Sequence, residues 1–435
     1  MAKSDLAQHG TAVPSTETAS SPSAAVETKR GGFKTFSSLQ NNKDYRYLFT
    51  GNLFANAAQW LQLLTVGWLV LEVSGGSALH AGAVVGLRSL PALILGPWAG
   101  VLADRWDRRK IAMLTQVGMA VAASLFAVVV ATGDITVWHA YVYMAVSGIG
   151  FTIKQPVRQA LIANTVKKPD MANALALNAM TVTSMRLVGP LIGGILIATA
   201  GFKWNFVFEA SLYIVMVLLL LPMHTPYREA GANRKASGWS NMVEGLRYIA
   251  KDRVMLRLNL LNFVRAAAFG TVPLILPAYV KDALGGGTNA GTAMLTIMGV
   301  GGLTATVIIA SWGFFTKKGM VGLITLTAGS ACILGLGLSH WLWLSMVFIT
   351  LQGFCQTHFI VSNQTLIQTL VPDSLRGRVS SVWSYEQGLT PLFVFLISLL
   401  AEYQGMGLGM TVLGASALAL SVFFFLRFTD NRTLD

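Results

Sequence analysis

Seven residues that carry a charge at neutral pH stand well inside long apolar stretches of this sequence. Five are bases and two are acids: Arg88, Lys154, Arg158, Arg186, Arg265, Glu209 and Glu386. If these stretches cross a bilayer, each charge at the helix centre costs about 2.5 kcal/mol or more, so each group needs a partner or a role. A buried carboxyl beside an arginine binds and releases a proton as the pair forms and separates. These residues are therefore candidates for ion pairing, substrate binding and proton transfer.

Side-chain amides recur along two of the apolar stretches. At about 100° per residue, the amides of the first stretch fall within roughly 120° of arc, and those of the second share a face beside a histidine. Such faces line a polar cavity or form interhelical hydrogen bonds, and the histidine either titrates near neutral pH or serves in packing. Two bases without an evident acid partner face the same cavity or extend towards the membrane surface. The candidate cavity residues are Asn52, Asn56, Gln59, Gln62, Lys154, Arg265, Gln352, Gln356, His358 and Asn363.

The sequence lacks the residues that catalysis, metal binding or ATP-driven transport would require. The sequence has no glycine-rich phosphate loop, no metal-ligand cluster and no nucleophile paired with a base. Cys332 and Cys355 each stand in an apolar stretch, which favours buried thiols over a disulfide or metal site. We therefore expect neither an enzyme nor an ATP-driven pump, and no metal or cofactor. The net charge of +13 comes from bases dispersed between apolar stretches, which disfavours nucleic acid as a partner.

The composition is that of a membrane protein. Hydrophobic residues make up 54% of the chain and charged residues 12%, with a mean hydropathy of +0.58; soluble domains carry about 25% charged residues. A helix needs about 20 apolar residues to cross a bilayer core. Twelve stretches meet this requirement: 47–71, 79–103, 111–131, 138–163, 172–199, 204–223, 258–280, 289–315, 319–338, 341–369, 376–401 and 406–426. The predicted fold class is an all-α membrane protein with twelve transmembrane helices.

The longest polar interruption divides these stretches into two sets of six. We expect a disordered tail over 1–42, a six-helix bundle over 43–223, a connector over 224–257, a second bundle over 258–428 and a short tail over 429–435. Within the connector, Trp239, Met242, Leu246 and Ile249 share one helical face, which indicates an interfacial amphipathic helix; a solvated linker is the alternative.

The two halves also resemble each other in sequence. The stretches 158–166 and 363–371 match at Gln159/Gln364, Leu161/Leu366, Ile162/Ile367 and Val166/Val371, and each ends the fourth apolar stretch of its half. Parallel repeats of this kind are found in transporters, where the halves are related by a pseudo-two-fold axis along the membrane normal.

The distribution of Lys and Arg predicts the orientation. With a cytoplasmic N-terminus, 25 of the 32 bases lie in cytoplasmic segments, whereas only Lys203 and Lys281 lie in outer loops. Cytoplasmic loops carry the excess of positive charge in membrane proteins. We therefore expect both termini in the cytoplasm of a multi-pass protein of the cytoplasmic membrane.

The charged loop "DRWDRRK" lies at the cytoplasmic end of the second stretch. A parallel repeat should bring that stretch beside the eleventh, whose helix begins near Ser374, with Arg376 at the same helix start. A helix N-terminus attracts a carboxylate by about 0.3–2 kcal/mol, so Asp104 is predicted to dock there and hold the cytoplasmic side shut. Arg158 reaches the same end and is grouped with this latch. The alternative is that the bases merely fix topology.

Depth along the helices suggests partners for the buried acids. At 1.5 Å per residue, Arg88 and Glu386 reach the same level on the second and eleventh stretches, which suggests an ion pair across the halves. This pair is either a site of proton coupling or a permanent structural ion pair. Arg186 and Glu209 also share a level, which suggests a structural pair within one half.

The spacing in the charged loop resembles the signature loop of the major facilitator superfamily. The matching residues are Gly100, Asp104, Arg105, Arg108, Arg109 and Lys110, with Asp107 where many members have a second glycine. In the fifth stretch "RLVGPLIGG" resembles the motif of proton-antiporting exporters, where Arg186 is followed by Gly189, Pro190, Gly193 and Gly194, and Met185 replaces an upstream glycine. From residue 37 to residue 428 the sequence resembles the enterobactin-exporter and macrolide-efflux branch of this superfamily.

This resemblance implies the major facilitator fold and transport by alternating access. It implies proton-coupled efflux of a small amphiphile, drug-like or siderophore-like, and the excess of buried bases favours an anionic or neutral substrate. Import or facilitated diffusion of a small metabolite is the alternative, and a membrane receptor or scaffold without transport is a more distant one. We expect a monomer in the lipid bilayer, with a small-molecule substrate and protons as the coupling ion.

The predicted topology can be tested by cysteine labelling in a background lacking Cys332 and Cys355. Lys110→Cys and Arg247→Cys should react with an impermeant maleimide only from the cytoplasmic side, whereas Lys203→Cys should react only from outside. Labelling of Lys110→Cys and Arg247→Cys from opposite sides would contradict two six-helix halves.

Overall fold

The structure is a computed structural model that describes residues 36–167, 170–224, 238–312, 317–372 and 376–434. Within these ranges its description of side chains omits residues 97, 100, 101, 103–105, 172, 238–242, 310–312, 376–378, 380–387 and 433. The described residues are almost entirely helical and contain no strand.

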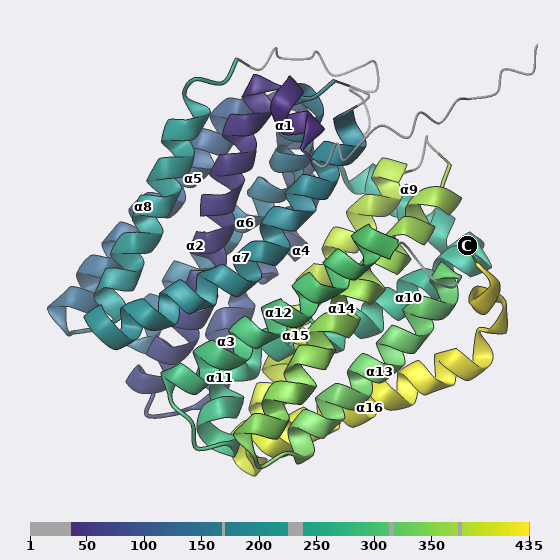
Figure 1. The fold of residues 1–435 in the computed structure, drawn as a ribbon. Coiled ribbons are helices and arrows are strands. Elements are labelled where there is room, and N and C mark those ends of the chain that lie inside the picture. Colours follow the sequence, from purple (N-terminus) through teal and green to yellow (C-terminus); the bar gives the residue numbers. More distant parts are fainter. Residues whose placement is uncertain (1–35, 168–169, 225–237, 313–316, 373–375, 435) are drawn as a thin grey trace, which may run out of the picture. The chain divides into compact units, whose positions relative to one another are not determined.

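Helices of the first half follow the six predicted stretches (Figure 1). After the short α1 (Ser37–Asn41) come α2 (Lys43–Val73), α3 (Ala78–Leu87), α4 (Leu90–Arg105), α5 (Arg108–Thr132), α6 (Val137–Thr165), α7 (Met171–Ala200) and α8 (Phe202–Leu220).

The connector contains α9 (Gly238–Lys251), and the second half begins directly after it. This half comprises α10 (Arg253–Ala268), α11 (Val272–Ala283), α12 (Thr288–Trp312), α13 (Lys318–Leu338), α14 (Leu342–Leu370), α15 (Arg376–Gln404) and α16 (Met406–Arg427), followed by the 3₁₀ turn η2 (Thr429–Thr433).

Most of the predicted spans meet the length and hydropathy that a membrane requires. Among the described residues, 10 helical segments are long and apolar enough to cross a bilayer, and α15 adds a shorter apolar stretch, Gly388–Gln404. The remaining segment, α6, is 29 residues long but carries Lys154 and Arg158, which make it more polar than the others. The predicted all-helical membrane fold is confirmed.

Two predicted spans are broken near their middle. The second is divided between α3 and α4 at Arg88 and Ser89, and the seventh between α10 and α11 at 269–271. Pro91 and Pro273 stand in the first turn of α4 and α11. Proline has no N–H to donate to the preceding turn but is tolerated in a first helical turn, so the helical hydrogen bonding is interrupted there and a new helix starts one residue before each proline. The first break places Arg88 deep inside the bundle.

Helix packing repeats between the halves. In the first half α5 packs against α8, α4 against α6 and α2 against α7; in the second α13 packs against α16, α12 against α14 and α10 against α15. Across the halves, α3 contacts α15 and α7 contacts α12. These two contacts are equivalent, because a two-fold axis relating the halves places the second span on the eighth and the eleventh on the fifth. This confirms the predicted pseudo-two-fold arrangement and the expected contact between the second and eleventh spans.

The halves meet closely at one side, which we call the hairpin side because it holds the loops 74–77, 133–136, 284–287 and 339–341. A Cβ atom added to Gly194 of α7 would lie 2.7 Å from the Thr292 Cβ of α12, and one added to Gly82 of α3 would lie 2.8 Å from the Ser398 Cβ of α15. Lys281 also donates to the Leu71 carbonyl across the halves, at 3.3 Å. The hairpin side is therefore closed in this structure.

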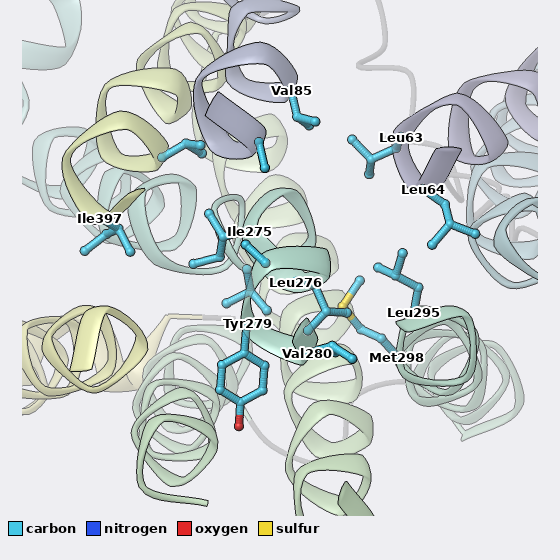
Figure 2. Close-up of a cluster of buried hydrophobic side chains, with 14 of the residues drawn as sticks. Leu63, Leu64, Val85, Ile275, Leu276, Tyr279, Val280, Leu295, Met298 and Ile397 are labelled. Atoms are coloured by element: carbon cyan, nitrogen blue, oxygen red, sulfur yellow. The ribbon is translucent and has the colours of Figure 1, made fainter. Parts of the chain in front are cut away.

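An apolar seal lies beneath these contacts. Ile275, Leu276, Tyr279 and Val280 of helix α11 lie at the centre of this apolar seal (Figure 2). Around them lie buried residues of α2, α3, α12 and α15, namely Leu63, Leu64, Val85, Leu295, Met298 and Ile397. Van der Waals packing between these side chains of both halves stabilises the closed arrangement.

At the opposite side of the helices, the connector helix α9 packs against α10 and α15. The predicted amphipathic helix is therefore present, and its Ile249 is buried with Leu258 and Leu366. Leu246 is 45% exposed, so only part of the predicted face is covered by protein. Trp239 and Met242 lie outside the described side chains.

Closure of the hairpin side predicts a specific crosslink. An ideal Cβ at Gly86 lies 3.5 Å from the Val394 Cβ, within the Cβ separation of about 3.5–4.5 Å found in disulfides. Gly86→Cys combined with Val394→Cys should therefore form an intramolecular disulfide on mild oxidation, detected by mass spectrometry. Gly118→Cys with Val394→Cys should not crosslink. Failure of the first pair to crosslink would contradict the contact of α3 with α15.

Candidate functional site

The charged loop begins α5 and ties it to the rest of the first half. Asp107 is the N-cap of α5 and accepts hydrogen bonds from the backbone N–H groups of Arg109 at 2.9 Å and Lys110 at 3.3 Å. Arg109 Nε donates to the Leu220 carbonyl at 2.8 Å, at the end of α8, where a cation is favoured by the helix dipole. One of the two acids in this loop therefore serves as a helix cap.

Arg108 fastens the same loop to α6. Its Nη1 donates to Asn164 Oδ1 at 3.0 Å. The side chains of Gly100, Asp104, Arg105 and Arg376 lie outside the described residues, so the latch between α4 and α15 stays a prediction. Arg158, which was grouped with this latch, instead lies in the interior of the first half, where it contacts Asn56 and Gln155.

The amides of α2 bond mainly to helices of their own half. Asn52 donates to Asn178 Oδ1 at 3.4 Å, and Asn56 donates to the Thr181 hydroxyl at 3.0 Å, both on α7. Lys154 donates to the Ala55 carbonyl at 3.3 Å and to Asn56 Oδ1 at 3.5 Å. Interhelical hydrogen bonding, one of the two alternatives, therefore occurs at these residues. Asn52 and Lys154 also line a small cavity with Arg158, so their role in a substrate cavity stays a prediction, and Gln59 is half-buried.

A carboxyl network lies deeper in the first half. Glu209 of α8 is fully buried, and its Oε1 accepts hydrogen bonds from Gln62 Nε2 at 2.8 Å and from the Tyr143 hydroxyl at 2.7 Å. Gln62 also donates to the Ser147 hydroxyl at 3.0 Å. Arg88 is close enough to Glu209 to interact electrostatically, and its guanidinium lies 4.6 Å from the centre of the Phe151 ring.

The predicted Arg186–Glu209 pair is wrong. Arg186 Nη1 donates to Gln356 Oε1 at 2.7 Å, and its guanidinium lies 4.9 Å from the Trp60 ring centre. Arg186 lies 14 residues before the end of α7 and Glu209 seven residues after the start of α8, so their levels differ by roughly 10 Å at 1.5 Å per residue. Arg186 also points from α7 towards α14 of the other half. Arg88 is instead the cation beside Glu209. The side chain of Glu386 lies outside the described residues, so the proposed Arg88–Glu386 pair stays untested.

Arg186 marks a polar layer between the halves. Gln356, which accepts from Arg186, donates through Nε2 to the Phe269 carbonyl at 3.1 Å, at the break between α10 and α11. Arg265 is 2% exposed, interacts electrostatically with Arg186, and donates from Nε to Asn262 Oδ1 at 2.8 Å. This layer therefore brings together the predicted cavity residues Arg265 and Gln356 with Arg186.

The other predicted residues of α14 lie along the same helix. Gln352 is fully buried, and both of its amide atoms lack a hydrogen-bond partner within the described residues. Asn363 donates to the Leu258 carbonyl at 3.4 Å. His358 packs against Phe354 with ring centres 4.7 Å apart, which agrees with the packing alternative.

Glycines of the predicted antiporter motif permit close helix contacts. A Cβ on Gly189 would lie 2.7 Å from the Trp60 Cβ, whereas Gly193 faces Leu61 and Leu64 of α2. Gly194 faces Thr292 of the other half. Pro190 is buried within α7. Gly189 and Gly193 therefore pack α7 against α2 of its own half, whereas Gly194 packs α7 against α12 of the other half.

Sequence reasoning missed Tyr143, Ser147 and Tyr213 as members of the buried network. Their spacing offered a signal, since Tyr143 and Ser147 are four residues apart on α6, and Glu209 and Tyr213 four apart on α8. Residues at this spacing lie on one helix face. Among the described residues, no group of three or more His, Cys, Asp and Glu could hold a metal ion.

Comparison with known proteins agrees with this architecture. Residues 34–432 match the family described as transmembrane secretion effector. The solved structure of a D-xylose-proton symporter superposes with a TM-score of 0.68 at 15% identity, covering 90% of this chain and 97% of that chain, and shows a similar fold.

Several relatives are similar over most of their length. The staphyloferrin A transporter of Staphylococcus aureus is 24% identical over 382 residues, 87% of this chain and 95% of that protein. The enterobactin exporter EntS of Shigella boydii is 25% identical over 346 residues, 74% of each chain. A Na(+), Li(+), K(+)/H(+) antiporter of Planococcus maritimus is 22% identical over 421 residues, 90% of this chain and 98% of that one.

The matched family extends over nearly the whole described chain, and the relatives are transporters rather than enzymes. The predicted relation to the enterobactin exporters is confirmed. The chain belongs to the transmembrane secretion effector family of the major facilitator superfamily and is a multi-pass secondary transporter of the membrane.

Proposed function

We propose that this transporter exports small anionic or neutral amphiphiles, drug-like or siderophore-like, in exchange for protons. The observation that carries the proposal is the Arg186–Gln356 hydrogen bond of 2.7 Å, which joins the two halves inside the polar layer. Alternating access requires polar contacts between the halves that can break and re-form around a substrate. Arg186 and Gln356 supply such a contact.

The charges of the interior support an anionic or neutral substrate. Arg186 and Arg265 lie together between the halves, and Arg88, Lys154 and Arg158 are held inside the first half. Glu209 is the one acid among the described residues of this interior, with Glu386 outside the described side chains. An excess of buried positive charge attracts anions and repels cations.

The names of the relatives support the same substrate class. Two of them are described as a transporter of staphyloferrin A and an exporter of enterobactin. The antiporter relative exchanges metal cations for protons, which supports protons as the coupling ion. The metal cations that this relative exchanges fit the positively charged interior of the present protein less well than an anionic solute does.

Reconstitution tests the proposal directly. Proteoliposomes containing the full chain should accumulate labelled enterobactin, or another member of a panel of anionic amphiphiles, when a pH gradient is imposed, and a protonophore should abolish accumulation. Downhill flux that ignores the pH gradient would instead indicate facilitated diffusion. Absence of flux for the whole panel would contradict export of anionic amphiphiles.

Replacement of Arg186 should weaken transport specifically. Arg186→Gln removes the guanidinium that would donate a charged hydrogen bond to an anionic substrate, worth about 1.5–3 kcal/mol, so substrate affinity should fall roughly tenfold or more, since about 1.4 kcal/mol corresponds to tenfold. The measurement is the concentration dependence of flux in proteoliposomes. Arg186→Lys should be intermediate because lysine keeps the charge but not the planar fork.

Lys203→Gln is the matched control for this prediction. Lys203 is an exposed cation near the Trp204 ring on the hairpin side, so the same change in charge should leave flux unaltered. Wild-type affinity and rate in Arg186→Gln would exclude the polar layer as the substrate site.

A further inference from the structure

Glu209 is a fully buried carboxyl that the substrate site does not use. Its Oε1 has two donors, Gln62 and Tyr143. Its Oε2 and the Tyr213 hydroxyl are both buried and lie close enough to interact, but no well-aligned hydrogen bond joins either atom to a group in the part of the chain that the structure describes. Buried polar atoms without partners are rare in proteins and need an explanation.

The groups around Glu209 define how its charge can be balanced. Arg88 approaches from the break between α3 and α4, Tyr143 from α6 and Tyr213 from the next turn of α8. Helix α2 contributes the neutral amide of Gln62. The other neighbours of α8 are α5 and α7.

These two helices present uncharged groups near the network. From α5, the Phe126 ring stacks on Tyr143 with centroids 4.4 Å apart. From α7, the Gly193 carbonyl accepts from Asn205 of α8 at 2.8 Å. Arg88 is thus the cation that can balance an ionised Glu209.

A hydrogen bond between Oε2 and the Tyr213 hydroxyl would satisfy both atoms, and either group can supply the proton of that bond. A carboxylic acid has one O–H donor, whereas a carboxylate only accepts hydrogen bonds. The O–H of a protonated Glu209 would donate to the Tyr213 oxygen beside it. In the ionised form, Tyr213 would donate to Oε2 and Arg88 would balance the charge, so the surroundings provide for both protonation states.

The position of Glu209 relates it to the hairpin side. It lies seven residues after the start of α8 at Phe202, or about 10 Å below that side at 1.5 Å per residue. Arg88 follows directly on α3, whose Gly82 and Gly86 contact α15. Separation of α3 from α15 would admit water first to Arg88 and then to Glu209.

We propose that Glu209 is a proton-binding site of this transporter, which takes up a proton from water when the hairpin side opens and holds it as that side closes. On opening, a proton from water binds to the carboxylate that Arg88 had balanced, and the Oε2–H bond forms. When the opposite side opens in turn, the Oε2–H bond breaks, the proton passes to water on that side, and Arg88 again balances the carboxylate. The proposal rests on the proposed function for its place in the transport cycle, but proton binding itself can be measured without a substrate.

Infrared titration of the purified full chain in nanodiscs tests proton binding. Wild-type protein should show the carbonyl band of a protonated, buried carboxyl that disappears at high pH. Glu209→Gln, which keeps size and hydrogen bonding, should lose this band, whereas Tyr213→Phe should keep it at a shifted frequency because its partner is removed. An unchanged band in Glu209→Gln would overturn the proposal. Circular dichroism and thermal unfolding verify that both variants are folded.

Transport assays then separate the proposal from the function on which it rests. With labelled enterobactin as the probe, Glu209→Gln should lose accumulation driven by a pH gradient but retain exchange of internal for external probe. Full accumulation in Glu209→Gln would overturn the inference even if wild-type transport is proton-driven. Loss of accumulation in Glu386→Gln alone would place coupling at Glu386 instead.

If wild-type protein shows no response to the pH gradient, the proposed function fails. The infrared band still decides whether Glu209 binds a proton in that case. The two failures are therefore distinguishable.

Discussion

The structure depends on one constraint: polar groups inside a bilayer must find their partners within the protein, since lipid offers none. Lys154 and Arg158 meet this constraint through Asn56. Glu209 meets it through Gln62 and Tyr143. These contacts hold helices of one half together. Arg186 meets the same constraint differently, through Gln356 of the other half, and so couples its own hydrogen bonding to the relative position of the halves.

Small residues allow the two halves to come close enough for such contacts. Interfaces between membrane helices are enriched in glycine, alanine, serine and threonine because close backbone approach replaces the hydrophobic driving force. Here Gly194 faces Thr292 and Gly82 faces Ser398. Together with the apolar residues of α11, these contacts seal one side of the polar layer. Opening that side must break several packing contacts at once, which favours discrete open and closed states over gradual movement.

The charged loop at the start of α5 combines a capping role with an anchoring role. Asp107 satisfies N–H groups at the helix start, and Arg109 bonds to the carbonyl groups at the end of α8. Both ends of helices carry backbone groups that their own helix cannot satisfy. An acid and a base in one short loop thus serve two neighbouring helices, which explains why charge of both signs is concentrated there.

The sequence alone determined the spans, the division into halves and the kinds of residue in the interior, because the length and hydropathy of a membrane helix are local properties. It also contained Pro91 and Pro273, whose effect on the spans can be read locally once their position in a first turn is known. Partners of the buried charges were decided only by the tertiary structure. Depth along a helix follows from residue number, but the direction in which a side chain points depends on how each helix is rotated against its neighbours. The sequence placed Arg186 and Glu209 at a similar level and so suggested a pair. The packing of α7 and α8 instead directs Arg186 to Gln356 of the other half and Glu209 to Gln62 and Tyr143 of its own half.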